Sequence, residues 1–371
     1  MKLIDIIAGA RPNFMKIAPI IRAIEARKGE DRLLKYRLIH TGQHYDARMS
    51  GDFFVQLGIP QPDINLEVGS GTQAEQSAAI MTRYERLLLD ATSDLCLVVG
   101  DVTSTMACAI VAQKLHIPVA HVEAGIRSND WKMPEEINRR VTDAITDWFF
   151  TTSEVASSNL RNSGVAEHRI FFVGNTMIDT LLANLSRLRK PDFWDDLDLK
   201  HKEYFVLTLH RPSNVDDEHA FTHLLRAIAN STRGLNVVFP VHPRTAKTLR
   251  ELKEIPASVR LVDPQAYLEF NYLVKNAKAV ITDSGGITEE TTVMGVPCLT
   301  LRDSTERPET VTTGTNELIG TNPAALGTVL DKLFAGQWKK GSTPLKWDGQ
   351  SGERIVQVLE RVLVHSSART L

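Results

Sequence analysis

Short apolar runs, rich in β-branched and aromatic residues, alternate with amphipathic segments along this chain of 371 residues. Because the runs show no regular polar–apolar alternation, they are typical of strands in a parallel sheet that is covered on both faces. Strands that alternate with helical segments in this way predict doubly wound α/β domains. The expected strands span 3–7, 36–40, 95–99, 119–122, 148–151, 170–173, 204–209, 236–241, 259–262, 279–282 and 298–301, and helical periodicity is clearest in 103–115 and 220–232.

The chain is too long for one ordinary hydrophobic core, which favours two domains. A polar, charge-dense stretch, RLRKPDFWDDLDLKHKE (187–203), separates the first series of strands from the second and is the best candidate for a boundary. We therefore expect two doubly wound domains that face each other across a cleft. In such sheets the ligand site lies beyond the carboxyl ends of the strands, so the residues that follow each strand are the first candidates for function.

The composition excludes several classes of protein. A net charge of −2 gives no electrostatic reason to bind nucleic acid or an anionic membrane, and no run approaches the roughly 20 apolar residues of a membrane span. The apolar N-terminal stretch is too short for a secretory signal and is broken by Gly9 and Pro12. Cys96, Cys108 and Cys298 form no CxxC pair and lie in apolar surroundings, as buried cysteines of a reduced compartment do. We expect a cytoplasmic protein.

Basic residues follow the first expected strand. The segment GARPNFMKIAP places Arg11 and Lys16 around the expected start of a helix. Two cations together with the amide groups of a helix start can bind an anion, and phosphate is the favoured ligand; a solvated helix start is the alternative. The GSG at 69–71 follows no strand and lacks the third glycine of a nucleotide-binding motif, which indicates a loop.

Carboxylates follow the next strands. Asp101 comes after the third strand, Glu123 after the fourth, and Glu135 opens the next helix. Each has a simpler explanation alone, because Asp101, Thr103 or Ser104 can cap a helix and acidic residues are common in a first helical turn. Together the three carboxylates could converge on one cleft, where neighbouring carboxylates raise one another's pKa and supply both an acid and a base. Metal binding is the rival use, but no HxH or HExxH spacing supports it.

The second series of strands ends in histidines and arginines. LTLHRPSN places His210 and Arg211 at a strand end, and FPVHPR does the same with His242 and Arg244. A cationic pair at a strand end suits phosphate, although a structural role is the alternative for each histidine.

The most specific phosphate signal is ITDSGGITEE. Gly285 and Gly286 would let a diphosphate approach the amide groups of a helix start, with the Ser284 hydroxyl as a further donor. Glu290, one turn along, could bind a ribose diol. Arg307, in DSTERPE, adds a cation to the same region.

A series of segments occurs in an order and at a spacing that identify a family. They are GARPNFMKIAP, HTGQHYD, GDVTST, HVEAGIRS, MPEEINRR, GNTMIDT, HRPSN, PVHPR, TDSGGITEE and RDSTERPE. Over essentially its whole length the chain closely resembles the UDP-N-acetylglucosamine 2-epimerases of the non-hydrolysing bacterial type. The resemblance implies a GT-B-like fold of two Rossmann-type domains with the active site between them, and a homodimer. It also implies domains at 1–174 with 355–371 and at 175–354, with a C-terminal helix at about 352–366 that packs on the N-terminal domain.

By this resemblance, epimerisation at C2 of the sugar uses no nicotinamide and no metal. The enzyme would eliminate UDP across C1–C2, hold a 2-acetamidoglucal, and add UDP back after protonation of C2 from the other face. The resemblance gives Asp101, Glu123 and Glu135 the roles of proton carriers and of the group that stabilises charge at C1, without assigning each role. His210 would assist the departing diphosphate as an acid or a cation.

The resemblance also implies which groups hold UDP. Arg11, Lys16, Ser284, Gly285, Gly286 and Arg307 would bind the phosphates, Glu290 the ribose, and Phe270 the uracil. Two segments depart from the family pattern. Thr288 stands where a Gln is expected, and Pro212 and Ser213 stand where an Arg and a Glu are expected.

Some members of the family bind a second UDP-N-acetylglucosamine as an activator beside the substrate. The segments that resemble this possible allosteric site contain Gln43, His44, Glu136, Arg211 and His242. The loop EVGSGTQAEQ lacks the basic residue that is expected there. The sequence therefore predicts that the substrate does not activate this protein.

Several alternatives stay open. The same chemistry could act on UDP-2,3-diacetamido-2,3-dideoxyglucuronic acid, whose carboxylate would need a further cation such as Arg127 or Arg139. A hydrolysing epimerase would release N-acetylmannosamine and UDP. A GT-B glycosyltransferase would leave three strand-end carboxylates without a role, and a catalytically silent nucleotide-sugar sensor would not need them.

Overall fold

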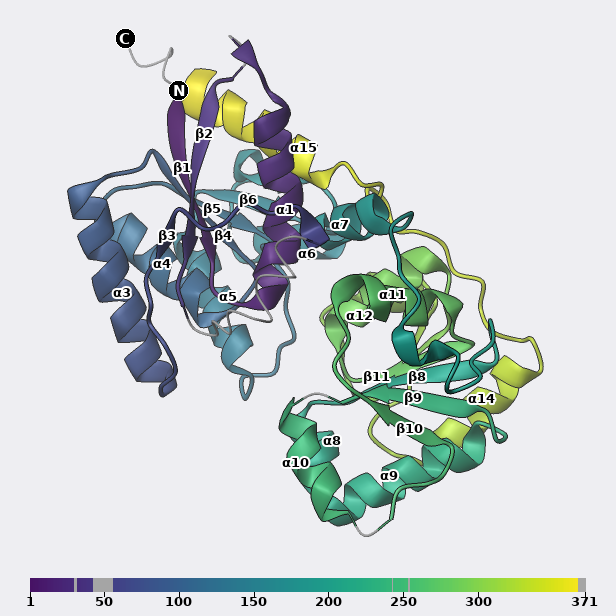
Figure 1. Ribbon diagram of the computed structural model, residues 1–371. Coiled ribbons are helices and arrows are strands. Elements are labelled where there is room, and N and C mark those ends of the chain that lie inside the picture. Colours follow the sequence, from purple (N-terminus) through teal and green to yellow (C-terminus); the bar gives the residue numbers. More distant parts are fainter. Residues whose placement is uncertain (30–31, 43–55, 242, 253, 366–371) are drawn as a thin grey trace. The chain divides into compact units, whose positions relative to one another are not determined.

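The computed structural model of the chain describes residues 1–29, 32–42, 56–241, 243–252 and 254–365. It divides into two compact units, which are Met1–Ala183 with Leu345–Leu371, and Asn184–Pro344. Each unit is built on one sheet, and every recorded pairing of its strands is parallel (Figure 1). The predicted architecture of two doubly wound α/β domains is confirmed.

The first unit contains a seven-stranded sheet in the order β3-β2-β1-β4-β5-β6-β7. Its strands are β1 (Lys2–Ala8), β2 (Leu34–His40), β3 (Ile64–Asn65), β4 (Leu95–Val99), β5 (Val119–Val122), β6 (Trp148–Thr151) and β7 (Ile170–Phe172). Because β1 lies between β2 and β4, the direction of winding reverses there. The loops after β1 and β4 therefore diverge at a switch point, where doubly wound sheets bind their ligands.

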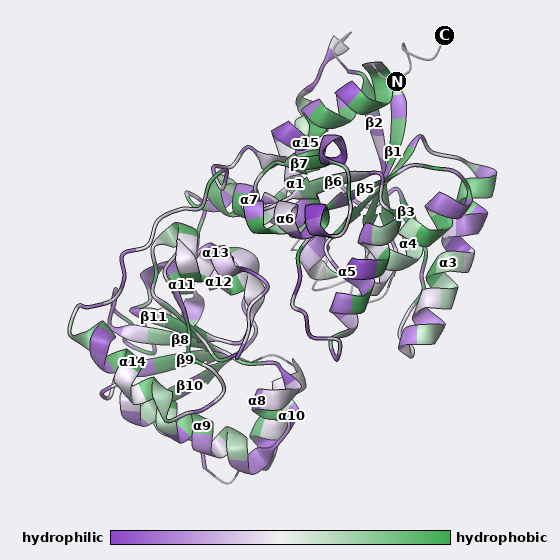
Figure 2. Cartoon of the chain, turned by 180° about the vertical axis from the view of Figure 1, so that it is seen from behind, coloured by the Kyte–Doolittle hydropathy of each residue, from purple (hydrophilic) through white to green (hydrophobic). Residues whose placement is uncertain are grey.

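Amphipathic helices cover this sheet, and its buried strands are mainly hydrophobic in Figure 2. The helical segments are α1 (Arg11–Ala26), α3 (Gln73–Asp90), α4 (Thr103–Lys114), α5 (Pro134–Ile145), α6 (Glu154–Asn162), η2 (Glu167–Arg169), α7 (Thr176–Asn184), α15 (Ser351–Glu360) and η4 (Arg361–His365). On one face, Ile80 and Tyr84 of α3 and Ala112 of α4 join a buried cluster with Ile7 and Val98 of the sheet. Apolar burial of this kind is the main source of the unit's stability.

The second unit contains a six-stranded sheet in the order β10-β9-β8-β11-β12-β13, with its switch point between β8 and β11. Its strands are β8 (Tyr204–Thr208), β9 (Asn236–Pro240), β10 (Val259–Val262), β11 (Ala279–Thr282), β12 (Cys298–Thr300) and β13 (Asn316–Leu318). The helical segments are η3 (Asp192–Trp194), α8 (Pro212–Val215), α9 (Glu218–Ser231), α10 (Pro243–Glu251), α11 (Tyr267–Asn276), α12 (Gly285–Met294), α13 (Pro308–Thr312) and α14 (Ala325–Phe334). Phe205, Leu225, Val237, Ile281 and Leu299 lie at the centre of its largest core cluster.

Every strand that the sequence predicts is present. The strands at 95–99, 119–122, 148–151, 259–262 and 279–282 match the prediction to the residue, and the others differ by at most two residues at an end. β3 and β13 were not predicted, because one has two residues and the other carries Asn316 and Glu317 among its three. The three cysteines are buried thiols, as expected.

In the described part of the chain, no helix combines the length and the apolar composition that crossing a membrane requires.

The two units divide at points that differ from those expected after 174 and 354. α7 belongs to the first unit because the Thr180 hydroxyl donates to the carbonyl oxygen of Met15 in α1 at 2.6 Å. The segment before α15 also belongs to it, because the indole N–H of Trp347 donates to the carbonyl oxygen of Thr152 at 3.0 Å. These contacts fix the chain on both sides of the second unit.

α15 packs along α1 (Figure 1). Arg27, at the end of α1, forms ion pairs with Glu353 at 2.7 Å and with Glu360 at 2.9 Å. Gly352 approaches α1 so closely that an added Cβ would lie 2.6 Å from the carbonyl oxygen of Pro19. α15 thus covers α1.

Gly174→Ala tests the contact between the loop after β7 and the segment before α15, which contains Lys346. Gly174 has a φ of +100°, and an added Cβ would lie 2.1 Å from the carbonyl oxygen of Lys346. Gly164→Ala is the matched control, since Gly164 has a φ of +86° and nothing within 4 Å of an added Cβ. We expect the control to lower the free energy of unfolding by about 1–2 kcal/mol through backbone strain alone. Gly174→Ala should lower it clearly further in urea unfolding, and equal losses would contradict the close contact.

Candidate functional site

The candidate residues lie at the carboxyl ends of the strands around each switch point. In the first unit the segment 9–16 follows β1, Asp101 follows β4, and Glu123 follows β5. In the second unit His210 follows β8 and the segment 283–286 follows β11. Each unit thus presents its own set of candidate residues at the position where such sheets bind ligands.

A buried ion pair joins the strand ends of the first unit. Nζ of Lys16 lies 2.6 Å from Oε2 of Glu123, and the two side chains are 9% and 3% exposed. Gly100 lies against the pair, since an added Cβ would be 3.1 Å from Nζ of Lys16. Asn13 donates to the carbonyl oxygen of Val99 at 3.0 Å, which ties the loop after β1 to the end of β4. Charges that are enclosed in this way interact far more strongly than charges in water.

Glu123 has an unusual backbone conformation. It comes directly after β5. Its φ is +68°, in the left-handed region that residues other than glycine seldom adopt. Neighbouring backbone groups hold it there. The N–H of Gly100 donates to the carbonyl oxygen of Val122 at 3.0 Å, and the N–H of Ala124 donates to that of Phe150 at 3.1 Å. Such conformations persist only where the surroundings fix them, and they cluster at functional sites.

Asp101 does not cap a helix. Val102 occupies the N-cap position of α4, and no side chain forms a capping hydrogen bond there, so the explanation of Asp101, Thr103 or Ser104 as a cap is wrong. The reason is a stronger partner. The guanidinium group of Arg139 in α5 donates to Oδ2 of Asp101, and a hydrogen bond between two charged groups exceeds a neutral one in strength.

Arg139 also binds Glu136, the fully buried carboxylate of the same helix, with Nη1 at 3.2 Å from Oε2. Glu136 accepts further hydrogen bonds from the N–H and hydroxyl of Ser128 and from Arg140. Burial alone would raise the pKa of Glu136, but these hydrogen bonds lower it below its ordinary value. Glu136 is therefore a charged group that α5 holds in place.

Glu135 lies at the start of α5 and is partly buried. One turn further on, Asn138 donates to the carbonyl oxygen of Asp101 at 2.9 Å. Residues three apart on a helix share a face, so Glu135 lies on the side of α5 that meets Asp101. The structure thus brings the three predicted carboxylates to one edge of the first sheet.

Asp283 organises the strand ends of the second unit. Its fully buried carboxylate accepts hydrogen bonds from the N–H of Arg211 at 2.9 Å and from Nδ2 of Asn214 at 3.0 Å, and it lies 2.8 Å from Nδ1 of His210. Burial alone would raise the pKa of Asp283, but these partners lower it below its ordinary value. The carboxylate fixes the orientation of the His210 ring, whose side chain is 44% exposed.

The start of α12 presents amide groups for an anion. Ser284 is the N-cap residue without a capping bond of its own, and Gly285 and Gly286 form the first turn. The hydroxyl of Thr288 donates to the carbonyl oxygen of Gly285 at 2.6 Å, so the residue that departs from the family pattern folds back on its own helix. The N–H groups of a first helical turn have no partner within the helix, which makes this turn suitable for phosphate.

Two arginines lie near this turn, and the sequence singled out only one. Arg307 donates through Nε to the fully buried Glu289, inside the unit. Arg302 follows β12 and lies closer to the turn, with Nη1 3.9 Å from the position of a Cβ added to Gly285. It forms a two-point ion pair with Glu306 at 2.7 and 2.8 Å. Its place directly after a predicted strand was the signal that could have found it.

Glu290 is a buried carboxyl group. The hydroxyl of Tyr267 donates to its Oε1 at 3.0 Å, and Nδ2 of Asn271 lies 3.5 Å from the same oxygen. Burial raises the pKa of Glu290 to about 7, although both hydrogen bonds act in the opposite direction. Phe270 lies on α11 with Tyr267 and Asn271, and it is half-buried against a core cluster on which Ile287 of α12 also packs.

Some predicted residues lie outside the described part of the chain. They are Gln43, His44 and His242, together with the side chain of Arg11.

A sequence model described as UDP-N-acetylglucosamine 2-epimerase matches residues 26–360. The UDP-N-acetylglucosamine 2-epimerase of Methanocaldococcus jannaschii is 41% identical over 370 residues, which cover 97% of this chain and 99% of that protein. The crystal structure of that enzyme in complex with UDP-GlcNAc and UDP superimposes with a TM-score of 0.85 over 97% of this chain and 99% of the other. The UDP-2,3-diacetamido-2,3-dideoxy-D-glucuronate 2-epimerase of Pseudomonas aeruginosa is 38% identical, and the match covers 98% of this chain and 100% of that protein.

Two parallel-sheet α/β units with polar strand ends, together with these matches, define a GT-B-like nucleotide-sugar epimerase. The chain belongs to the UDP-N-acetylglucosamine 2-epimerase family, since the family match and the relatives extend over nearly all of it. This agrees with the resemblance that the motifs carry.

Glu290→Gln should remove one source of pH dependence. The pKa of Glu290 is about 7 in the folded chain and roughly 4.3 in the unfolded chain. The folded state therefore binds more protons between these values, so its stability is highest below the lower value and falls as pH rises through the upper one. Relative to the Gln variant, the unmodified protein should lose about 3 kcal/mol of unfolding free energy between pH 5 and pH 8 in urea titrations. If the difference in unfolding free energy between the two proteins does not change with pH, Glu290 titrates like an exposed carboxyl.

Proposed function

We propose that the protein interconverts UDP-N-acetylglucosamine and UDP-N-acetylmannosamine by eliminating UDP and adding it back through 2-acetamidoglucal. The observation that carries this proposal is the cluster at the first switch point. There the carboxylate of Glu123 is buried against Lys16 at 2.6 Å, and Asp101 follows the neighbouring strand. Burying a carboxylate costs free energy, and the left-handed backbone conformation of Glu123 adds a further cost. Both features suit a residue that does chemistry.

The reaction needs several proton carriers. No carbonyl group acidifies the C2 proton, so UDP departs with the electron pair of the C1–O bond and positive charge develops at C1. One carboxylate stabilises this charge while a second takes the C2 proton, and the C1–C2 double bond of the glycal forms. In the return step a carrier on the other face protonates C2, and a UDP oxygen attacks C1. Asp101, Glu123 and Glu135 fill these roles.

The second unit supplies the groups that suit UDP. The amide groups of Gly285 and Gly286, the Ser284 hydroxyl and the nearby Arg302 favour a diphosphate. His210 assists its departure, since Asp283 holds the ring at the strand end. Glu290 and Phe270 take the ribose and the uracil. Lys16 and Arg307 stay candidates for the phosphates, although each already pairs with a carboxylate, Lys16 with Glu123 and Arg307 with Glu289.

A second candidate substrate is UDP-2,3-diacetamido-2,3-dideoxyglucuronic acid, which the 38% identical relative from Pseudomonas aeruginosa supports. The carboxylate of that sugar would need a cation. Arg127 is paired with Asp143 at 2.6 Å and Arg139 with Asp101 and Glu136, so each already has a carboxylate partner. This favours the uncharged sugar. A hydrolysing epimerase would differ only in releasing UDP and free N-acetylmannosamine.

Proton NMR of the purified protein with UDP-N-acetylglucosamine in D2O tests the proposal. We expect UDP-N-acetylmannosamine with deuterium at C2, because the C2 proton is lost and a deuteron from the solvent replaces it. Stoichiometric UDP and free N-acetylmannosamine would establish the hydrolysing reaction instead. If no product forms while UDP binds, the diacetamido-uronate is the substrate to test next.

Glu123→Gln and Asp101→Asn should each reduce turnover by about a hundredfold or more, because an amide cannot exchange a proton as a carboxylate does. Affinity for UDP, measured by calorimetry, should stay within a few-fold. Glu154→Gln is the matched control, since this carboxylate of the first unit is 63% exposed and pairs with Arg161, which is itself 37% exposed. A variant of Asp101 or Glu123 that turns over at a near-normal rate would remove that residue from the mechanism.

The rate should depend hyperbolically on substrate concentration. The loop 67–76 carries no basic residue, and the buried carboxylate of Glu136 already binds Ser128, Arg139 and Arg140. Steady-state rates over a wide range of UDP-N-acetylglucosamine concentrations check this. A sigmoidal curve, or a lag that added substrate removes, would show activation by the substrate.

A further inference from the structure

His121 links two turns of the proposed site. It is fully buried in β5, two residues before Glu123. Its Nδ1 lies 2.8 Å from Oδ1 of Asp143 in α5, and its Nε2 lies 2.8 Å from the carbonyl oxygen of Gly100. Gly100 directly precedes Asp101, so this ring touches the turn that carries one of the proposed catalytic carboxylates.

Both ring nitrogens of His121 face hydrogen-bond acceptors. A backbone carbonyl oxygen cannot donate, so Nε2 of the ring donates to Gly100, and Nδ1 lies against the carboxylate of Asp143. Burial alone would raise the pKa of Asp143, but its contacts with His121 and Arg127 lower it below its ordinary value. The His121 ring thus bridges α5 and the turn that precedes Asp101.

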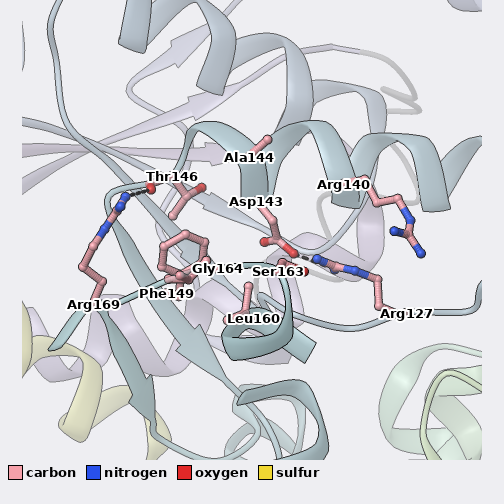
Figure 3. Close-up of a pocket in the computed structure, with 11 residues that line it drawn as sticks. Arg127, Arg140, Asp143, Ala144, Thr146, Phe149, Leu160, Ser163, Gly164 and Arg169 are labelled. Atoms are coloured by element: carbon pink, nitrogen blue, oxygen red, sulfur yellow. Dashed lines mark hydrogen bonds and ion pairs between the residues drawn. The ribbon is translucent and has the colours of Figure 1, made fainter. Parts of the chain in front are cut away.

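Asp143 extends the link to the turn that follows Glu123. Its Oδ2 accepts from the N–H of Gly125 at 3.1 Å and from Nη1 of Arg127 at 2.6 Å. Figure 3 shows the side chains of Arg127 and Asp143 directed toward one another at a cavity of about 310 Å³. A single carboxylate of α5 thus binds both ends of the segment 121–127.

This segment contains the strained residue. The φ of Glu123 is +68°. A residue other than glycine leaves this backbone conformation unless its neighbours hold it there. His121 lies on one side of Glu123, Gly125 lies on the other, and both bind Asp143. Through the Gly100 carbonyl, His121 also holds the turn that aims Asp101.

We propose that His121, Asp143 and Arg127 form a hydrogen-bonded clamp that positions Asp101 and Glu123 for proton transfer. The proposed function gives none of the three a role on the substrate, so they are positioning residues. The inference rests on the proposed function and adds to it the groups that set the geometry of its acid and base. Small displacements of such groups slow proton transfer strongly while leaving binding intact.

The first unit offers a matched control in Asp5. This carboxylate in β1 is fully buried, lies 2.7 Å from Nε of Arg37, and accepts from the hydroxyl of Tyr84 at 3.0 Å. Like Asp143 it is a buried carboxylate that pairs with an arginine. Its partners, however, lie in β2 and α3 and not at the turns that carry Asp101 and Glu123. A purely structural role for both carboxylates predicts the same result for Asp5→Asn and Asp143→Asn.

Steady-state kinetics of the two variants test the clamp. Asp143→Asn puts an amide NH2 group where either His121 or Arg127 needs an acceptor, so we expect kcat to fall about tenfold or more with KM within about twofold. Asp5→Asn should lower the melting temperature and leave kcat unchanged. If Asp143→Asn lowers only the melting temperature, the positioning role is overturned.

Crystal structures of Asp143→Asn and His121→Gln give a readout independent of activity. In either variant we expect Glu123 to leave its left-handed backbone conformation or the turn at Gly100 to move, because the clamp no longer holds them, whereas Asp5→Asn should leave both in place. Unchanged positions of Glu123 and Asp101 in both variants would overturn the clamp. If the unmodified protein epimerises none of the tested UDP-sugars, the proposed function fails, whereas the structures still decide whether the clamp exists.

Discussion

The ion pair between Lys16 and Glu123 is the contact on which the arrangement of the first unit depends. It joins the helix after β1 to the end of β5, and Gly100 at the end of β4 leaves room for it. A buried pair contributes little more stability than apolar residues of similar size, yet removal of one partner costs about 3–5 kcal/mol. The pair therefore holds two charged groups in place at the strand ends of the first sheet, where the proposed site lies.

Most of the fold follows from local sequence. The strands match because long β-branched runs are buried on both faces of a sheet, where no other structure satisfies them so well. β3 and β13 escaped prediction because edge strands need few residues and tolerate polar ones. The division between units also escaped, since it depends on contacts between distant segments, such as that of Trp347 with Thr152.

The candidate site residues could be predicted from their places at strand ends, but the partners that the structure gives them could not. Lys16 was expected at a phosphate and lies against Glu123, and Arg307 was expected there and lies against Glu289. Arg302 and the ring of His121 gave no local signal beyond a position after or within a strand. Ion pairing between residues that are far apart in sequence is decided by the topology of the sheet, which a single sequence specifies only indirectly.

The contact between α1 and α15 bears on how the chain folds as it is synthesised. Residues 1–183 are synthesised before α15, but the face of α1 that receives Gly352 and pairs Arg27 with Glu353 has no cover until α15 is made. The second unit is continuous from Asn184 to Pro344 and can fold in the interval. The first unit is thus completed only after the second has been synthesised, and until then this face of α1 stays open to chaperones or aggregation.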